Sequence, residues 1–413
     1  MNKVPKLRFA GFAGQWEESK LSKINKFSKG SGYSKSNLSE NGYPIYLYGQ
    51  MYTNYTSQIN YIDTFVDKII KNSVISSGNE VLIPSSGETD IDLARASHLN
   101  LEDVIIGGDL NILTPGDKIS AHFEALSLTT DKKRRSLSKL AQGKSVVHLY
   151  GNDIKNETIR YPSKHEQEKI ANLFKKIDAL IEKQEDKVSK MEDFKKSMLQ
   201  KIFPKKGELV PEFRFKGFDD KWIVKNIGEL MNVTSVKRVM QSDWQTYGVP
   251  FLRARDLVAF SEGDEIEEKL FISESLYNEY SQISGKVSTG DLLVTGVGSI
   301  GIPYLVENEE PIYFKDGNII WLVNNKVMDG RFLYYSFLSR NVIKFINKSS
   351  GKGTVGTLTI STTKRIPLVH PSLEEQEKIG NFFKNLDSQI ETEKKLLDSY
   401  KMMKKSLLQK LFV

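Results

Sequence analysis

The segment HEQEKIANLFKKIDALIE, residues 165–182, recurs in nearly the same form as EEQEKIGNFFKNLDSQIE, residues 374–391. The offset between the two copies is 209 residues, and the same offset aligns SMLQKIF (197–203) with SLLQKLF (406–412). The two copies therefore have equal length, without an insertion. The fold prediction depends on why one chain carries this charged segment twice, in its middle and at its end.

A second repeated element opens each half of the chain. PKLRFAGFAGQW (5–16) matches PEFRFKGFDDKW (211–222) at an offset of 206 residues. Between these anchors the similarity is weaker but continues, with GYPIYLYGQM matching GVPFLRARDL, NEVLIPSSG matching GDLLVTGVG, and GGDLNIL matching DGNIIWL. This period is far too long for a solenoid. The chain is a duplication of one domain and one helix, which predicts pseudo-twofold symmetry.

The closing segment of each half has the pattern of a long amphipathic helix. Apolar residues recur every three or four positions, as in a heptad repeat, and Lys and Glu occupy the other faces. A Ser followed three residues later by Glu, Ser163 with Glu166 and Ser372 with Glu375, predicts a capping box at each start. The predicted apolar stripe consists of Ile170, Leu173, Ile177, Leu180, Val188, Met191, Met198, Ile202, Ile379, Phe382, Leu386, Ile390, Leu397, Tyr400, Leu407 and Leu411.

Such a helix is too long to leave its apolar stripe in water. From Glu166 to Phe203 it would measure roughly 57 Å at 1.5 Å per residue. Two equal copies in one chain predict that they pair as an antiparallel coiled coil, with the two less similar domains at its opposite ends. The alternative is that each helix packs on its own domain as ordinary core, which would leave the equal lengths unexplained.

Composition limits the kind of protein. The chain has 413 residues, no run of apolar residues long enough for a membrane span, and no apolar stretch at its start like that of a signal peptide. It has no cysteine, which excludes disulfides, cysteine-based zinc sites and cysteine nucleophiles and suits a cytoplasmic location. The net charge of +7 favours a polyanionic partner such as nucleic acid. Many of the 17 tyrosines lie near Lys and Arg in polar segments, which is compatible both with such a partner and with ordinary strand and turn positions.

Short motifs that resemble catalytic or nucleotide-binding sites lack the surrounding sequence that such sites require. GVGSIG (296–301) matches a dinucleotide-binding pattern, but IPYLVENEEPIYF follows where a helix would have to hold the pyrophosphate, so a tight turn between strands is expected. GKGTVG (351–356) lacks P-loop spacing and is expected to be a basic loop, and EEK (267–269) lacks an acidic partner. The five histidines form no HExxH pattern, and there is no GxSxG. We therefore expect no catalytic residue, no bound cofactor and no metal site.

The remaining candidates are polar and basic residues suited to reading duplex DNA. Arg253, Arg255 and Asp256 in FLRARDL could contact base edges, and Lys237 and Arg238 could hold phosphates. A solvated or locally paired surface residue is the alternative for each one taken singly. The other candidates are Lys35, Tyr46, Tyr48, Gln50, Ser85, Ser86, Gly298 and Lys352.

With both repeats in view, the whole chain resembles the specificity subunit of type I restriction–modification enzymes. The resemblance rests on VPKLRFAGF and VPEFRFKGF, on GDLLVTGVGSIG, and on the two EQEKI…LQK(I/L)F segments in this order. It implies an α+β fold with two pseudo-twofold-related α/β target recognition domains, separated by two long helices that form an antiparallel coiled coil. The implied boundaries are 1–163 and 207–372 for the recognition domains and 164–206 and 373–413 for the spacer helices.

The same resemblance implies a non-catalytic role in a larger assembly. Each recognition domain would read one half of a split sequence in double-stranded DNA, and IPSSG against VTGVGSIG implies different half-sites. Two methyltransferase subunits would dock on the helices and methylate adenine N6 with S-adenosylmethionine. Two motor–nuclease subunits would use ATP and Mg²⁺ to cleave unmodified DNA, and no membrane is involved. The alternative from another class is a coiled-coil scaffold protein without sequence specificity.

Overall fold

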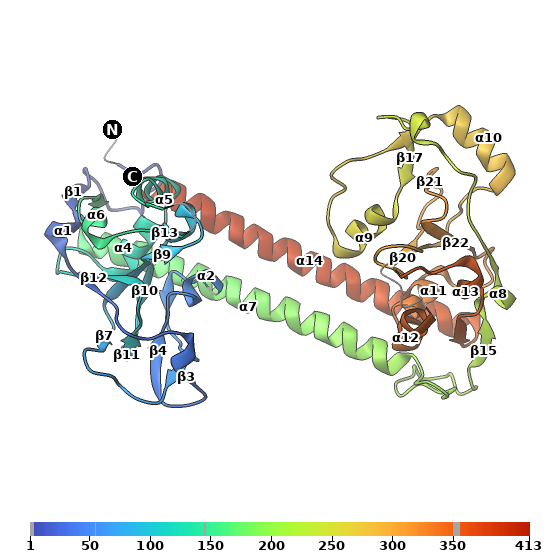
Figure 1. Cartoon of the computed structure of the whole chain (residues 1–413), viewed down its shortest axis with the longest axis horizontal. Helices are drawn as coiled ribbons and strands as arrows, with labels where there is room; N and C mark the ends of the chain where they lie inside the picture. The colour runs from blue at the N-terminus through green and yellow to red at the C-terminus, as the bar shows by residue number, and fades with distance from the viewer. Residues whose placement is uncertain (1–3, 54, 144–145, 350–355) are drawn as a thin grey trace. The chain divides into compact units, whose positions relative to one another are not determined.

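The chain folds into two compact units, which are described separately (Figure 1). Unit 1 combines Met1–Glu185 with Lys395–Val413, and unit 2 is Asp186–Lys394. Each unit contains one globular domain and parts of both long helices, and both chain ends belong to unit 1. The computed structural model describes residues 4–53, 55–143, 146–349 and 356–413.

The globular domain of unit 1 is built mainly from short strands. Its two larger sheets have the strand orders β2-β12-β8-β10-β5 and β3-β6-β4-β11-β7, and β1-β14 and β13-β9 are two-stranded. The strands are β1 (Glu17–Lys20), β2 (Asn25–Lys29), β3 (Leu38–Ser39), β4 (Tyr43–Tyr46), β5 (Gln58–Ile59), β6 (Phe65–Val66), β7 (Val74–Ser77), β8 (Glu80–Pro84), β9 (Ser86–Gly87), β10 (Ser97–Leu99), β11 (Glu102–Ile106), β12 (Leu110–Pro115), β13 (Val147–His148) and β14 (Thr158–Tyr161). The short helices are α1 (Leu21–Ile24), η1 (Lys35–Asn37), α2 (Gln50–Thr53), α3 (Asp90–Leu93), α4 (Ala121–Leu128), α5 (Asp131–Ser138) and α6 (Gly151–Ile154).

The globular domain of unit 2 contains more helix. Its sheets have the orders β16-β22-β19-β20, β18-β17-β21 and β15-β23. The strands are β15 (Ile223–Asn226), β16 (Asn232–Thr234), β17 (Val249–Leu252), β18 (Phe271–Ile272), β19 (Leu292–Thr295), β20 (Pro303–Leu305), β21 (Tyr313–Phe314), β22 (Ile319–Val323) and β23 (Pro367–His370). The helices are α8 (Ile227–Leu230), η2 (Gln241–Asp243), α9 (Ala254–Glu262), α10 (Glu274–Ser284), α11 (Gly330–Phe337), α12 (Arg340–Ser349) and α13 (Ile360–Lys364).

The weak internal similarity seen in the sequence corresponds to a shared sheet framework. The order β2-β12-β8 in unit 1 matches β16-β22-β19 in unit 2, and in each case the neighbours pair antiparallel. The pair β4 and β11 is parallel, as is the pair β17 and β21. The duplicated framework therefore persists where the side chains have diverged, because buried strands require only apolar residues of suitable size.

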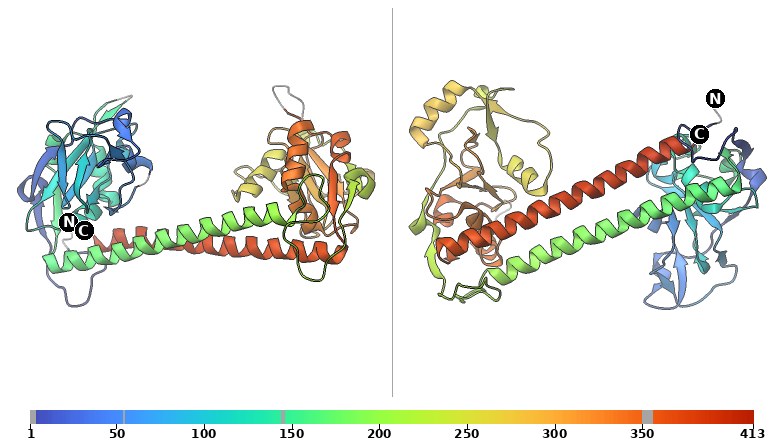
Figure 2. Two further views of the ribbon diagram at one scale, coloured as in Figure 1. Left: turned by 90° about the horizontal axis from the view of Figure 1, so that it is seen from below. Right: turned by 180° about the vertical axis from the view of Figure 1, so that it is seen from behind.

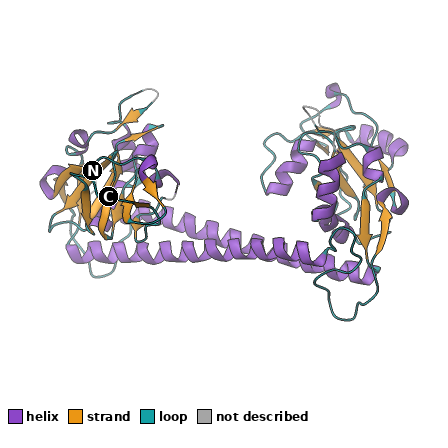
Figure 3. Ribbon diagram, turned by 60° about the horizontal axis from the view of Figure 1, so that its bottom comes forward, coloured by secondary structure: helices purple, strands orange, loops and turns teal. Residues whose placement is uncertain are grey.

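Two long helices, α7 (Lys164–Ile202) and α14 (Leu373–Leu411), lie side by side within each unit (Figures 2 and 3). Ion pairs between them fix the antiparallel direction: in unit 1 Lys401 binds Glu185 at 2.7 Å, and in unit 2 Lys394 binds Glu192 at 2.6 Å. These two pairs occupy equivalent positions in the repeat with the charges exchanged. The α+β class, with two globular domains and two long paired helices, is confirmed.

The apolar stripe predicted for the helix pair is mostly covered. Only Leu180 among its members is largely exposed, at 47%. Leu173, Met191, Phe382, Leu397, Tyr400 and Leu407 are half-buried. The buried members are Ile170, Ile177, Val188, Met198, Ile202, Ile379, Leu386, Ile390 and Leu411.

The start of each long helix packs in the core of one unit, and the phenylalanine that follows its end packs in the core of the other unit. Ile170 and Phe174 near the start of α7 belong to the core of unit 1, so packing on the helix's own domain occurs together with helix pairing. Phe412 after α14 packs in unit 1, with ring centroids 5.2–6.3 Å from those of Trp16, Phe123 and Phe174. Phe203 after α7 packs equivalently in unit 2, at 5.5–6.4 Å from Trp222, Phe332 and Phe383.

The repeated residues at the helix starts act as connections to the globular domains. The carboxylate of Glu166 accepts hydrogen bonds from Arg8 at 2.8 and 2.7 Å, and that of Glu375 accepts from Arg214 at 2.9 and 2.8 Å. The sequence had predicted that Glu166 and Glu375 cap their own helices, as part of a capping box, and had not predicted these arginine partners. Since both Glu side chains are 1% exposed, charge-assisted pairing is required to offset their desolvation.

One difference between the copies has a steric cause. Ala171 of α7 is replaced by Gly380 in α14. A Cβ on Gly380 would lie 2.5 Å from Oδ1 of Asp329 and 2.9 Å from Cβ of Arg331, at the start of α11. Glycine therefore allows α11 to approach α14 closely in unit 2.

Candidate nucleic-acid interface

The clearest cationic surface of unit 2 places lysines over aromatic rings. We define the cation–aromatic surface as Lys237, Trp244, Tyr277, Tyr280, Lys286 and Lys315. Nζ of Lys237 lies 4.2 Å from the ring centroid of Tyr280, Nζ of Lys286 5.7 Å from that of Tyr277, and Nζ of Lys315 5.9 Å from that of Trp244. Such stacking orders each ammonium group while leaving it able to donate hydrogen bonds outward.

A buried tyrosine connects the parts of this surface. The ring of Tyr313 on β21 contacts the rings of Tyr277 and Tyr280 on α10 at 6.3 and 6.4 Å. Its hydroxyl donates to the carbonyl of Lys237 at 2.9 Å, and burial raises the pKa of Tyr313 to about 12. The hydroxyl therefore keeps its proton at neutral pH and holds the loop that carries Lys237 against α10.

Lys237 of this surface and its neighbour in the chain, Arg238, differ in how firmly they are already paired. Arg238 is 72% exposed, and its Nε lies 2.9 Å from Oδ2 of Asp316. Lys237 is 41% exposed and is 3.9 Å from Glu279, at the limit of an ion pair. Exposed pairs of this kind contribute little to stability and exchange readily for phosphate contacts.

Two of the three residues predicted to contact base edges near Arg253 face inward. Arg253 is 9% exposed and donates to both carboxylate oxygens of Asp256, at 3.0 and 3.1 Å. Oδ2 of Asp256 also accepts from the backbone N–H of Arg253 at 2.7 Å, which caps the start of α9. Arg255 is 63% exposed and pairs with Glu268 at 2.6 Å. The geometry gives Arg253 and Asp256 a structural role and leaves Arg255 as the accessible arginine of the group.

In unit 1, aromatic and polar side chains form a continuous edge. We define the unit 1 aromatic edge as Tyr48, Tyr52, Ser86, His148 and Tyr150. The rings of Tyr48 and Tyr52 meet at 6.1 Å, the Tyr52 hydroxyl donates to the Ser86 carbonyl at 2.8 Å, and the rings of His148 and Tyr150 stack at 6.0 Å. Oγ of Ser86 and Nδ1 of His148 are 3.3 Å apart.

Members of this edge are accessible and come from distant parts of the chain. Tyr48 is 38% and Tyr150 is 50% exposed. The guanidinium of Arg95 lies 5.3 Å from the Tyr52 ring centroid and donates to the Met51 carbonyl at 2.9 Å, which supports the edge from behind. Exposed aromatic faces beside hydrogen-bonding groups can stack on bases or pack against sugars.

The other predicted residues of unit 1 have varied positions. Lys35 is exposed in η1. Gln50 accepts from the Leu47 N–H at 2.8 Å and donates to Thr64 at 3.2 Å, so its amide stabilises a turn. The side chains of Tyr46 (4% exposed) and Ser85 (5% exposed) lie in the interior. Burial raises the pKa of Tyr46, which keeps its hydroxyl protonated.

The glycine-rich motif of unit 2 forms a hairpin turn. Residues 296–301 connect β19 to β20, which pair antiparallel, and this confirms the expected tight turn between strands. Gly298 has a φ of +69° and lies exposed, with open space where a side chain would be. Lys352 and most of GKGTVG lie outside the described residues.

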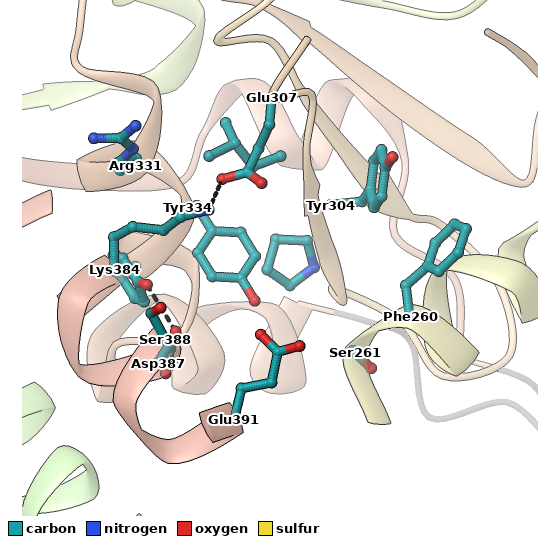
Figure 4. Close-up of a pocket in the computed structure, with 13 residues that line it drawn as sticks. Phe260, Ser261, Tyr304, Glu307, Arg331, Tyr334, Lys384, Asp387, Ser388 and Glu391 are labelled. Carbon is teal, nitrogen blue, oxygen red and sulfur yellow. Dashed lines mark hydrogen bonds and ion pairs between the residues drawn. The ribbon is translucent and has the colours of Figure 1, made fainter. Parts of the chain in front are cut away.

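A pocket of about 430 Å³ lies in unit 2 between the globular domain and α14 (Figure 4). Phe260 and Tyr304 line one side with their rings stacked at 5.2 Å, and Asp387, Ser388 and Glu391 of α14 line the other. The lining of the pocket combines aromatic side chains with charged ones. In the described parts of the chain no group of three or more His, Asp or Glu side chains could hold a metal ion. Nor is any described helix long and apolar enough for a membrane crossing.

Comparisons with known proteins agree with this organisation. A family model for the type I restriction modification DNA specificity domain matches residues 14–190 and again residues 219–400. The specificity subunits of the type I restriction enzymes MjaVIII and MjaIX of Methanocaldococcus jannaschii are 26% identical over 299 residues and 24% identical over 315 residues. These alignments cover 67% and 74% of this chain, but 66% and 71% of the two relatives, so the chain spans slightly less than two thirds of the first.

Two solved structures share the fold. The crystal structure of the type I restriction-modification S subunit from M. genitalium matches with a TM-score of 0.61 at 18% identity, covering 99% of both chains. A structure described for complex assembly and conformational transition of the type I R-M system matches with a TM-score of 0.56 at 15% identity, covering 96% of this chain and 97% of the other. Because the family model matches both halves of the duplication, this chain belongs to the family of type I restriction–modification specificity (S) subunits.

Proposed function

We propose that this chain reads a split target in double-stranded DNA, one half with each recognition domain. Residues 1–163 and 207–372 would form the recognition domains, and residues 164–206 and 373–413 the helices that set the spacing between the half-sites. The observation that carries the proposal is that one duplicated framework bears two unlike surfaces, the cation–aromatic surface and the unit 1 aromatic edge. A common framework with different side chains suits the reading of two different sequences at a fixed separation.

The physical roles of the two kinds of residue differ. Lysines over aromatic rings, such as Lys237 over Tyr280, suit sequence-independent phosphate contacts that hold the duplex in register. Exposed polar and aromatic groups, such as Tyr48 and Arg255, suit contacts to base edges or sugars. DNA recognition by this chain would therefore combine sequence-independent phosphate contacts with sequence-specific contacts to bases.

The catalytic steps belong to proposed partners. We infer that two methyltransferase subunits dock on the helices and methylate adenine N6 with S-adenosylmethionine, since an adenine within a duplex must be flipped out by an enzyme held in register. Two motor–nuclease subunits using ATP and Mg²⁺ would cleave unmodified DNA. Support comes from the related structure that is described for assembly of the type I R-M system.

A domain exchange tests the proposal. Residues 1–163 are replaced by another recognition domain, and methylated adenines are mapped by sequencing after expression with the methyltransferase partner. The replacement must keep aromatic residues at the positions of Trp16 and Phe123, because Phe412 packs against both. One half of the methylated sequence should change, while the other half and the spacing stay the same. A change in both halves would contradict the modular proposal.

A matched exchange of residues 207–372, with Trp222 and Phe332 retained around Phe203, should change only the other half. Binding of duplex DNA at increasing salt separates the scaffold alternative from the proposal. A phosphate-binding protein loses affinity steeply with salt, whereas a scaffold without DNA-binding function has no such affinity to lose.

A further inference from the structure

Two aspartates at equivalent positions of the repeat join the long helices to each other. Asp178 of α7 lies in unit 1, and its Oδ1 is 2.5 Å from Nζ of Lys404 on α14. Asp387 of α14 lies in unit 2, and its Oδ1 is 2.5 Å from Nζ of Lys195 on α7. Lys195 and Lys404 are also equivalent in the repeat. The same ion pair therefore forms twice, once in each unit.

The second oxygen of each aspartate is bound by the globular domain. Oδ2 of Asp178 accepts from the Ser57 hydroxyl at 2.7 Å, and Oδ2 of Asp387 accepts from the Tyr335 hydroxyl at 2.7 Å. Ser57 lies between α2 and β5, whereas Tyr335 lies in α11, so the two hydroxyls come from parts of the domains that do not correspond. Both donors are almost fully buried, with exposures of 1% and 3%.

We propose that Asp178 and Asp387 are positioning residues that fix the orientation of each recognition domain on the helix pair, and through it the spacing between the half-sites that the complex accepts. The part that concerns spacing rests on the proposed function. Each carboxylate meets an ammonium from the opposite helix and a hydroxyl from the domain, and charge-assisted hydrogen bonds of this length are directional. A domain that tilts or slides along the helix loses the hydroxyl contact.

The surroundings of each aspartate support this role. In unit 1, Nε2 of His122 lies 3.2 Å from Oγ of Ser57, which holds the hydroxyl in place. Because Ser57 donates its proton to Asp178, the order of contacts differs from that of a nucleophilic triad, in which the serine proton goes to histidine. In unit 2, Asp387 borders the 430 Å³ pocket, across which Phe260 and Tyr304 lie (Figure 4). The ring of Tyr335 also packs on that of Phe383 of α14 at 4.8 Å, so the hydrogen bond to Asp387 adds a directional contact to the apolar packing at this junction.

The first test measures orientation without DNA. The chain has no cysteine, so spin labels can be introduced at Ile283→Cys on α10 and Gln389→Cys on α14 of the full chain, both at exposed positions of unit 2. Asp387→Asn and Lys195→Met should broaden the distribution of distances between the labels. Loss of one charge-assisted hydrogen bond should shift the equilibrium between seated and tilted domains by about tenfold. Tyr335→Phe should produce the same broadening, because it removes the domain's hydroxyl alone.

Two controls separate positioning from general stability. Lys195→Arg keeps the charge and should keep the narrow distribution. Asp186→Asn breaks a surface ion pair with Lys190 within α7, at 2.6 Å, and should leave the distribution unchanged. A distribution that stays narrow in folded Asp387→Asn and Lys195→Met chains would overturn the proposal.

The second test measures spacing, with the unlabelled chain in complex with its methyltransferase partner. The wild-type complex should methylate DNA at one spacing, whereas Asp387→Asn should also methylate targets with a spacer one base pair longer or shorter, at unchanged half-sites. Unchanged spacing with a broadened label distribution would overturn the part that concerns spacing. If the wild-type complex methylates no split target at all, the proposed function fails, while the label distances still decide whether the aspartates orient the domains.

Discussion

Arg8 binds Glu166 through two hydrogen bonds of 2.8 and 2.7 Å, and this pair ties the first residues of the chain to the start of α7. Arg214 and Glu375 repeat the arrangement at the start of α14. In each case the backbone of the preceding residue also caps the other long helix: the Leu7 N–H donates to the Lys410 carbonyl at 2.9 Å, and the Phe213 N–H to the Lys201 carbonyl at 3.0 Å. The opening segment of each half thus connects the start of one helix with the end of the other.

Replacing either arginine should destabilise its own unit. Arg8→Ala leaves the carboxylate of Glu166, 1% exposed, without its counter-ion, and should cost about 3 kcal/mol of unfolding free energy. Urea unfolding followed by hydrogen exchange of unit 1 would measure this loss, and Arg214→Ala should act equally on unit 2. Lys190→Ala, which breaks an exposed pair with Asp186, should cost no more than about 0.5 kcal/mol. Similar losses for Arg8 and Lys190 would show that the buried pair has no special role.

The phenylalanine that follows each long helix should stabilise the unit in which it is buried. Phe203→Ala removes a ring that packs on Trp222, Phe332 and Phe383, and should cost unit 2 about 3–5 kcal/mol. Phe412→Ala should have the same effect on unit 1. Hydrogen exchange resolved by peptide would show which unit loses protection. Phe194→Ala, at a 50% exposed site of α7, is the control and should change the free energy of unfolding little.

The steric role of Gly380 predicts that the two helices prefer different residues at equivalent positions: α14 should be more stable with glycine, and α7 with alanine. Gly380→Ala should destabilise unit 2 by about 1–3 kcal/mol, because the added Cβ would lie 2.5 Å from Asp329. In an exposed helix this substitution would instead gain about 1 kcal/mol from helix propensity. Ala171→Gly at the equivalent site of α7 should destabilise unit 1 through lost propensity. Thermal unfolding of both variants tests this, and stabilisation by Gly380→Ala would contradict the close approach of α11.

Sequence alone predicted the architecture because the duplication was preserved in the residues that join helices and domains. The repeat identified both long helices, their antiparallel pairing and the matching strands such as β8 and β19. It did not reveal which repeated residues meet. Glu166 looked like half of a capping box, but its partner is Arg8, far away in the sequence. Trp16 and Phe412 were both recognised as repeated, yet nothing local shows that they pack together.

The candidate site was harder to predict, since side-chain direction depends on tertiary context. Tyr46 lies on a strand with its ring inward, and Arg253 occupies a helix N-cap where Asp256 and Glu268 hold it. Tyr280 and His148 were not predicted as site residues, because their partners Lys237 and Ser86 come from distant parts of the sequence. Lys237 and Tyr48 were selected on residue type and lie on the surfaces defined here, where their contacts to DNA stay predictions.

A buried carboxylic acid should make unit 1 less stable as the pH rises from about 4.5 to about 8. Glu124 on α4 is fully buried, its Oε1 accepts from Asn25 at 2.6 Å, and burial raises its pKa from 4.5 to about 8. The folded state therefore keeps a proton that the unfolded state releases above pH 4.5. This contribution to stability is fully present below pH 4.5 and is lost as the pH rises through about 8. Glu124→Gln, which mimics the protonated acid, should flatten the pH dependence of the unfolding free energy across this window. Glu168→Gln, at an exposed position of α7, should leave the dependence as in the wild type.

The cation–aromatic surface predicts how DNA binding responds to salt. Lys237→Ala and Lys286→Ala each remove one ammonium group positioned by a tyrosine ring, and each should weaken binding to all duplexes alike. The slope of log affinity against log salt should fall by about one for each lysine that contacts a phosphate. Lys190→Ala, on the surface of α7, is the matched control for loss of charge.

Arg253→Ala should behave differently, because it leaves Asp256 buried without its partner. Its main effect should be a lower stability of the domain and not a changed sequence preference. Filter binding at several salt concentrations, with unfolding measured on the same variants, separates these effects. If Lys237→Ala leaves both affinity and salt slope as in Lys190→Ala, the surface does not contact phosphate, and reading of DNA by unit 2 must be sought elsewhere, beginning with the exposed Arg255.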